Sequence, residues 1–373
     1  MSSVLRAVLS PRAIAAAGLG WGSVIALAVV GPQRPDLLAG PAIAGLLAIV
    51  VAVVVVCAFG VVAQAERLAR LLGDPYGTLV LTLSIVAIEV VLISAVMLGP
   101  GEHETIARDS VMAVAMIILN LVVGAALVAG GLRHDVLAAR SEGATAYLSV
   151  LVVLLVAAFA LPGLIGSGGA FRPAQAVPIL VLTILLYAFF LARQTGAQRA
   201  DFQEIGSEEE HGRAPLGEVW RAHRAEILAR AATLVVTVLP VVLLSHDMAV
   251  LLDEGLARAG APVALSGILI AAVVFLPETI TTIRAALAGE MQRVSNLCHG
   301  ALVSTVGLTI PAVLAIGLAT GQTVVLAETP TNLVLLAATL LLSATTFASR
   351  RVTAVHGAAH LMLFALYGLS VFA

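Results

Sequence analysis

The sequence has little charge, no lysine and almost no cysteine. Only 11% of its 373 residues are charged, and all twenty basic residues are arginine. Ordinary soluble domains are about one-quarter charged, so the composition argues against that class. Cys57 and Cys298 both lie within apolar runs, where small buried hydrophobes are expected rather than a disulfide or metal ligands. The sequence lacks HExxH, GxSxG and phosphate-binding glycine-loop motifs, so hydrolytic and nucleotide-driven chemistry have no support.

Hydrophobic residues make up 60% of the chain and gather in long runs. A transmembrane helix needs about 20 apolar residues, and runs such as 42–65 and 333–348 meet or approach that length. The first run is longer than the apolar core of a signal peptide, which favours a retained span. We therefore predict an all-α polytopic membrane protein with about eleven transmembrane helices. The expected spans lie near residues 13–31, 40–64, 77–98, 110–131, 145–165, 175–193, 229–252, 262–287, 293–318, 331–348 and 355–373.

The distribution of arginine predicts the orientation of these spans. Sixteen arginines fall on one face of the membrane and four on the other. Positive residues are retained on the cytoplasmic side, so we expect a multi-pass protein of the cell (inner) membrane. Its N-terminus should lie in the cytoplasm and its C-terminus outside. The four arginines expected outside are Arg34, Arg108, Arg172 and Arg258.

A long hydrophilic segment divides the chain into two halves. We expect a leading helix with the N-terminus over 1–39, a first five-helix repeat over 40–193, an acidic cytoplasmic linker over 194–228 and a second five-helix repeat over 229–373. Five spans per half force the second half to enter the membrane from the opposite side. That arrangement is an inverted-topology repeat, which is common among secondary transporters with a site at the midplane.

Two carboxylates lie deep inside predicted spans. Glu89 is midway through the second span of the first repeat, and Glu278 is midway through the second span of the second repeat. An ionisable group in the bilayer core is costly and is a functional candidate by default. A single such glutamate could be a structural hydrogen-bond anchor, but two at matched positions favour ion binding.

Neutral oxygen donors lie one helix further along in each repeat. Asn120 stands in a long aliphatic run, which favours a functional role for its amide, whereas Ser304 and Thr305 could also serve helix packing. Pro277 removes a backbone donor just before Glu278 and is expected to free carbonyls in the preceding turn. The residues expected to support the two carboxylates are Thr82, Ser84, Pro277, Thr281 and Thr282.

These groups predict a hard-cation site that exchanges its ion for protons. Calcium prefers about six to eight oxygen ligands, and Glu89, Glu278, the neutral donors and backbone carbonyls could supply them. Burial disfavours the charged form of a carboxylate, whereas a bound cation favours it. The site should therefore hold either protons or the metal, and this competition produces obligate exchange.

The central linker carries a run of carboxylates with no basic residue between them. A solubilising surface is one interpretation, and a low-affinity strip that attracts cations and regulates turnover is the other. The segment lacks the glycine-centred spacing of a calcium-binding loop, so high-affinity sensing is not expected. The carboxylates are Asp201, Glu204, Glu208, Glu209 and Glu210.

Four stretches together resemble bacterial calcium/proton antiporters of the calcium/cation antiporter superfamily. They are GDPYGTLVLTLSIVAIEVVLIS, RDSVMAVAMIILNLVVGAALVAGGLRH, LPETITTIRAALAGEMQRVSN and GALVSTVGLTIPAVLAIG. The resemblance implies eleven helices, one leading helix and two inverted five-helix repeats, with Glu89 and Glu278 as the ion-binding glutamates. It places Asn120, Ser304 and Thr305 in the flanking repeat helices. The eukaryotic Gly-Asn pair before each glutamate is absent here, and similar bacterial proteins are also credited with sodium and potassium exchange.

The predicted function is export of cytoplasmic Ca²⁺ in exchange for external H⁺ by alternating access. A Na⁺ or K⁺/H⁺ antiporter that uses the same glutamates is the first alternative. An intramembrane enzyme or a passive cation channel is the alternative from a different class, and no nucleophile–base pair supports an enzyme. The expected partners are the lipid bilayer and the transported cations and protons, with no cofactor and no nucleic acid.

Overall fold

The computed structural model describes most of the chain. It covers residues 8–30, 38–72, 104–204, 216–261, 264–349 and 351–372, together with residues 83, 86, 87, 89, 90, 93, 94 and 97. The chain forms two compact units, the first from Met1–Leu92 and Glu209–Pro277 and the second from Ile93–Glu208 and Glu278–Ala373. Each unit therefore combines a stretch from the first half of the sequence with a stretch from the second half.

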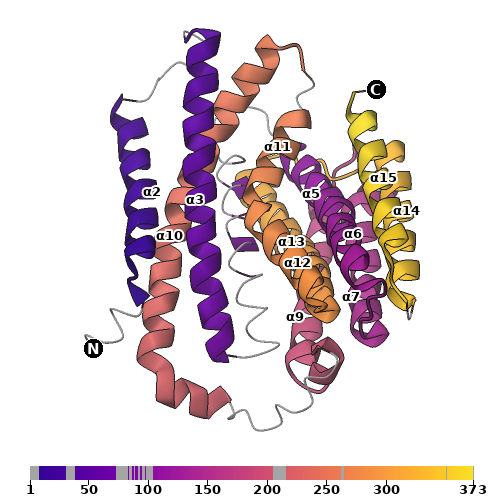
Figure 1. Ribbon diagram of the computed structural model, residues 1–373. Coiled ribbons are helices and arrows are strands. Elements are labelled where there is room, and N and C mark those ends of the chain that lie inside the picture. The colour runs from indigo at the N-terminus through magenta and orange to yellow at the C-terminus, as the bar shows by residue number, and fades with distance from the viewer. Residues whose placement is uncertain are drawn as a thin grey trace. The chain divides into compact units, whose positions relative to one another are not determined.

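The helices of the first unit are α2 (Pro11–Val30), α3 (Gly40–Leu72), α10 (Leu216–Arg258) and α11 (Ala264–Val274). Helices α2, α3 and α10 lie side by side (Figure 1). Gly20 permits close packing, because a Cβ there would lie 2.8 Å from Cβ of Pro240 and 2.9 Å from Sγ of Cys57. The Cys57 thiol donates a 3.3 Å hydrogen bond to the Ala16 carbonyl. Cys57 is thus a free, buried packing residue, as the sequence predicts.

The second unit contains the remaining helices, and two of its spans include π-helical turns. In chain order they are α5 (Ile106–Met116), η2 (Ile117–Val122), α6 (Val123–His134), α7 (Ser141–Leu155), η3 (Val156–Ala160), α8 (Leu161–Ile165), α9 (Pro173–Thr195), η4 (Arg199–Phe202), α12 (Leu276–Ala288), α13 (Met291–Thr320), α14 (Pro330–Ala348) and α15 (Ala354–Val371). Helix α13 is buried along most of its length and packs against α7 and α9, while α15 packs against α6 (Figure 1). The unit is thus organised around one central helix.

The prediction of an all-α polytopic membrane protein is confirmed. Nine helices within the described residues are long and apolar enough to cross a membrane, or ten if α11 and α12 count as one broken span. The expected third span, near 77–98, lies largely outside the described residues.

One boundary differs from the expectation. Helix α10 begins at Leu216, inside the segment expected to be a linker up to residue 228. Hydropathy locates the apolar core of a span and not its charged ends, which stay helical when ion pairs one turn apart support them. Glu226 and Arg230 form such a pair at 2.6 Å.

The crossing of α6 and α15 depends on glycine. A Cβ on Gly357 would lie 2.6 Å from the Gly124 carbonyl oxygen and 2.7 Å from the Val128 backbone nitrogen, so the two backbones are in contact. The substitution Gly357→Val is expected to force α15 away from α6 and to lower the free energy of unfolding by about 1–3 kcal/mol. A thermal melt of the purified protein in detergent measures this effect.

Gly368→Val on the same helix is the matched control. A Cβ at Gly368 meets nothing within 4 Å among the described residues, so this variant should melt like the wild type. Equal melting temperatures for the two variants would contradict the close packing at Gly357.

Candidate ion-binding site

Glu278 lies in the first turn of α12, directly after a break in the helix. Helix α11 ends at Val274, Phe275 is in a turn and α12 begins at Leu276. The interruption falls where the sequence predicts that Pro277 disturbs the backbone. Glu278 exposes only 7% of its surface, and its Oε1 has no hydrogen-bond partner among the residues that the structure describes. The helix N-terminus favours a negative charge at Glu278. A cation or a proton could bind the Oε1 that lacks a hydrogen-bond partner.

Hydroxyl groups lie on the same side of α12 as Glu278. Thr281 and Thr282 follow it by three and four residues, a spacing that places side chains on one helix face, and both are buried. The Cys298 thiol of α13 neighbours both Thr282 and the Glu278 carboxyl group. Helices α12 and α13 therefore bring a carboxylate, hydroxyls and a thiol together.

Helix α13 also carries the predicted donors Ser304 and Thr305. Both residues are buried. The hydroxyl of Tyr187 on α9 donates a 3.0 Å hydrogen bond to Oγ of Ser304. One turn beyond Thr305, the Thr309 hydroxyl is buried and has no hydrogen-bond partner within the described part of the chain. Ser304 is thus already engaged by the protein, whereas Thr309 is an oxygen that sequence reasoning did not single out.

Asn120 lies in the π-helical turn η2 and is completely buried. Turns of this kind occur frequently at functional sites. Its Nδ2 donates a 2.9 Å hydrogen bond to Oγ1 of Thr339 on α14. Its Oδ1 lies 3.3 Å from Nδ1 of His360 on α15, and Nε2 of His360 lies 3.4 Å from Oγ1 of Thr346. With its proton on Nδ1, His360 donates to Asn120 and accepts from Thr346. We call Asn120, Thr339, Thr346 and His360 the Asn120 network.

Sequence reasoning found Asn120 but missed the three other members of the Asn120 network. Thr339, Ser343 and Thr346 recur at intervals of four and three residues in an apolar run, which places them on one helix face. All three are completely buried. The spacing of these three residues could therefore have predicted a buried polar face from the sequence. A lone histidine such as His360 gives little indication of its partner.

The two predicted glutamates belong to different units. Glu89 is helical and buried, with 5% of its surface exposed, and lies in the first unit. Glu278 opens the second part of the second unit, which also holds Asn120, Ser304 and Thr305. Their convergence with Glu89 on one site stays a prediction. Two predicted supporting residues, Thr82 and Ser84, lie outside the described residues.

The start of the acidic linker packs against α13. Oε2 of Glu204 accepts a 3.1 Å hydrogen bond from the backbone N–H of Arg293 in the first turn of α13. Phe202 is buried, and its carbonyl accepts a 2.6 Å hydrogen bond from Asn296. Glu204 therefore caps a helix, a role that its charge pattern did not indicate. Asp201 is half-buried, and the other carboxylates predicted to regulate turnover lie outside the described residues: Glu208, Glu209 and Glu210.

A set of apolar spanning helices with a buried carboxylate at a helix break is the architecture of a secondary cation transporter. The family model for the sodium/calcium exchanger protein matches residues 42–196 and 230–373. The chain therefore belongs to the sodium/calcium exchanger family, and it is a secondary cation exchanger and not an enzyme.

Two curated relatives align with most of the chain. The putative ionic transporter y4hA of Sinorhizobium fredii (strain NBRC 101917 / NGR234) is 36% identical over 353 residues, 93% of this chain and 92% of that protein. The sodium-potassium/proton antiporter ChaA of Escherichia coli (strain K12) is 32% identical over 320 residues, 85% of this chain and 86% of that protein. Both similarities extend over the two halves of the sequence.

Solved structures share the fold at lower identity. Native YfkE has a TM-score of 0.66 at 17% identity and covers 97% of this chain and 98% of its own. The H⁺/Ca²⁺ exchanger CAX has a TM-score of 0.63 at 17% identity and covers 96% of this chain and 87% of its own. These similarities confirm the predicted fold class.

Proposed function

We propose that this chain is a proton-coupled antiporter that removes a cation from the cytoplasm in exchange for an external proton. The buried Glu278 carboxyl group carries the proposal, because one of its oxygens has no hydrogen-bond partner in the described part of the chain. A cation and a proton would compete for that oxygen, and burial disfavours the charged group when neither is bound. This competition couples the two fluxes. Glu89 is the second carboxylate of the proposed site.

For the cargo, we propose Na⁺ or K⁺ first and Ca²⁺ second, which reverses the order that the sequence alone favours. The relative that is 32% identical is named a sodium-potassium/proton antiporter. Calcium takes about six to eight oxygen ligands, but the Asn120 Oδ1 already contacts Nδ1 of His360 and the Ser304 Oγ accepts a hydrogen bond from Tyr187. Calcium remains the second candidate because two glutamates would balance its charge.

The proposal includes the topology. We infer a protein of the cell membrane with its N-terminus in the cytoplasm and its C-terminus outside, and inverted repeats over 40–193 and 229–373. The asymmetric distribution of arginine supports this orientation. The repeat boundaries are supported by the family model, which matches two separate segments, 42–196 and 230–373.

The test is proton flux in inside-out membrane vesicles. The vesicles are first acidified inside, and a pH-sensitive dye then reports the effect of adding Na⁺, K⁺ or Ca²⁺. We expect Na⁺ or K⁺ to dissipate the proton gradient. Glu142→Gln, which alters an exposed carboxylate at the start of α7, should respond like the wild type. A response to Ca²⁺ alone would select the second candidate, and no response to any of the three ions would refute the proposal.

A further inference from the structure

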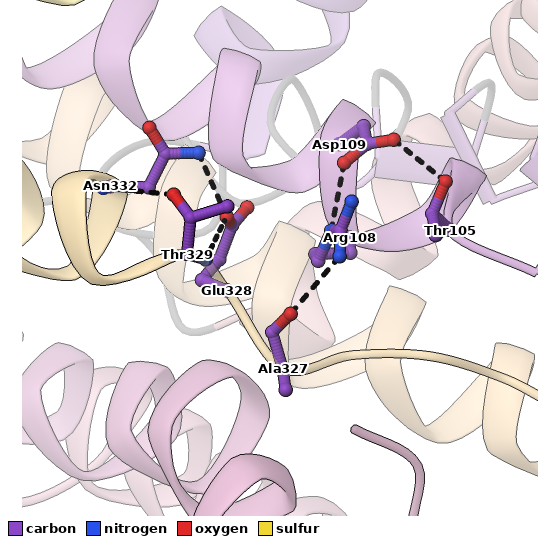
Figure 2. Close-up of polar contacts among 7 residues, drawn as sticks. All are labelled: Thr105, Arg108, Asp109, Ala327, Glu328, Thr329 and Asn332. Carbon is purple, nitrogen blue, oxygen red and sulfur yellow. Dashed lines mark hydrogen bonds and ion pairs between the residues drawn. The ribbon is translucent and has the colours of Figure 1, made fainter. Parts of the chain in front are cut away.

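Glu328 is a buried carboxyl group that the proposed exchange does not use. It lies just before α14 and exposes 7% of its surface. Its Oε2 accepts hydrogen bonds from the Thr329 backbone N–H at 3.1 Å and from Nδ2 of Asn332 at 2.8 Å (Figure 2). Its Oε1 is buried without a hydrogen-bond partner among the described residues. One oxygen is therefore held firmly, while the other is available to bind a proton.

The start of α5 supplies the charges that act on Glu328. Arg108 donates from Nε to Oδ1 of Asp109 at 2.8 Å and from Nη1 to the Ala327 carbonyl at 3.1 Å (Figure 2). Asp109 also accepts a 2.9 Å hydrogen bond from the Thr105 hydroxyl. The hydrogen bonds of Arg108 thus go to Asp109 and to the backbone, and Arg108 acts on Glu328 only as a nearby charge.

The other elements around Glu328 add little charge. Turn η3, whose Phe159 carbonyl accepts the Glu328 N–H at 3.0 Å, has no titratable side chain. Helix α15 contributes Tyr367, which interacts electrostatically with Glu328. The connection over 166–172, which bonds the backbone next to Glu328 through Gly169, has Arg172 as its one charged residue.

These surroundings favour the protonated form of Glu328. Burial raises the pKa of Glu328 above its ordinary value, and the charge of Asp109 adds to the increase. The hydrogen bonds from Asn332 and Thr329 and the positive charge of Arg108 lower the pKa and partly oppose that increase. Burial is the largest of these effects, so the net direction is upward.

The continuous span of α5, η2 and α6 is joined to the segment of Ala327 and α14 in two places. Arg108 of α5 binds the Ala327 carbonyl, next to Glu328. Twelve residues further along the chain, about 18 Å at 1.5 Å per residue, Asn120 binds Thr339 of α14. A change of charge at Glu328 alters the force on Arg108, and therefore acts on the helix that carries Asn120. Glu328 lies beyond the C-terminal end of α13, whereas Glu204 caps its N-terminal end.

We propose that Glu328 is a proton-binding site, separate from the transport glutamates, on the side of the membrane opposite the acidic linker. Arg108, Asp109, Asn332 and the backbone of Thr329 surround it. Resting on the proposed function, we further infer that its protonation state sets the rate of exchange through the α5–α14 contact. The ligand is the external proton, and the site makes exchange respond to external pH.

Infrared titration of the purified protein tests proton binding without any transport. The band of protonated carboxyl groups is followed from acidic to alkaline pH in the wild type, Glu328→Gln, Asp109→Asn and Glu104→Gln. We expect one titrating carboxyl group to be lost in Glu328→Gln and to move to lower pH in Asp109→Asn, because the negative charge of Asp109 raises the Glu328 pKa. Glu104→Gln, an exposed carboxylate on the same side, should leave it unchanged. An identical titration in the wild type and Glu328→Gln would overturn the proton site.

Cation exchange in proteoliposomes, measured at equal pH on both sides over a series of pH values, tests the effect on rate. Glu328→Gln should lose one pH-dependent step and keep the wild-type rate at acidic pH, where the side chain at position 328 is neutral in both proteins. A pH profile identical to that of the wild type would overturn the effect on exchange, even if the infrared titration supports proton binding. If wild-type protein exchanges no cation at all, the proposed function fails, and the infrared result alone still decides whether Glu328 binds the proton.

The pH dependence of protein stability also tests proton binding at Glu328, because proton binding and folding are thermodynamically linked. Because the pKa of Glu328 is higher in the folded state than in the unfolded state, the folded protein binds more protons between those two values. The free energy of unfolding therefore falls as pH rises through that window and is lowest above it. Glu328→Gln should remove this loss. Its melting temperature should therefore increase relative to that of the wild type as pH rises. A constant difference at every pH would contradict the proposal.

Discussion

Replacing Glu278 by glutamine is expected to abolish cation/proton exchange while the protein still folds. Glutamine has the same size, but it can neither balance the charge of a cation nor bind and release a proton. Removing one member of a buried charge pair costs about 3–5 kcal/mol. Because about 1.4 kcal/mol corresponds to a factor of ten, exchange should fall by about 100-fold or more. The measurement is cation-evoked proton flux in inside-out vesicles with matched amounts of wild-type and variant protein.

Two comparisons separate this result from a folding defect. Glu278→Asp keeps the charge on a shorter side chain, so it should retain part of the flux with a weaker apparent affinity for the cation. Glu278→Gln should melt at or above the wild-type temperature, because it removes an ionisable group whose Oε1 lacks a partner within the described residues. Wild-type flux in the glutamine variant would refute the assignment of Glu278 to the ion site.

The spans and the helix break before Glu278 could be predicted because they depend on local properties of the sequence. Apolar runs of about 20 residues define transmembrane helices without any knowledge of their neighbours. A proline beside a buried glutamate likewise marks a break by local chemistry, and α11 does end at Val274, three residues before Pro277. The start of α10 at Leu216 was missed because charged helical ends carry no hydropathy signal.

The Asn120 network could not be predicted because its members are far apart in the sequence. Thr339 lies 219 residues from Asn120, and His360 lies 240 residues from it. Periodicity within one helix can show that a polar face is buried, but it cannot show which helix that face meets. Glu328 posed the opposite difficulty, since a glutamate in a short connection ordinarily indicates exposure to solvent. Its burial follows from tertiary contacts of the backbone around it with Phe159 and Gly169.

Replacing Asn120 by leucine is expected to destabilise the second unit through the partners that it leaves behind. Leucine fills a similar volume, but the Thr339 hydroxyl and Nδ1 of His360 would each lose a hydrogen bond. Hydrogen bonds between transmembrane helices contribute about 0.6 kcal/mol on average and at most about 1.7 kcal/mol. The loss should therefore be about 1–3 kcal/mol, and a thermal or denaturant melt in detergent measures it.

A double-mutant cycle with Thr339→Val isolates the bond between Asn120 and Thr339. Thr339→Val removes the hydroxyl with little change of shape. The free energy of unfolding lost in the double variant should therefore be smaller than the sum of the two single losses by about 0.6–1.7 kcal/mol. Additive losses would show that the 2.9 Å contact contributes nothing.

The same variants also define the role of Asn120 in exchange. If Asn120 acts by holding η2 against α14, Thr339→Val should slow exchange as Asn120→Leu does. If its amide binds the cation directly, Asn120→Leu should weaken the apparent cation affinity far more than Thr339→Val, because only the first substitution removes the amide oxygen.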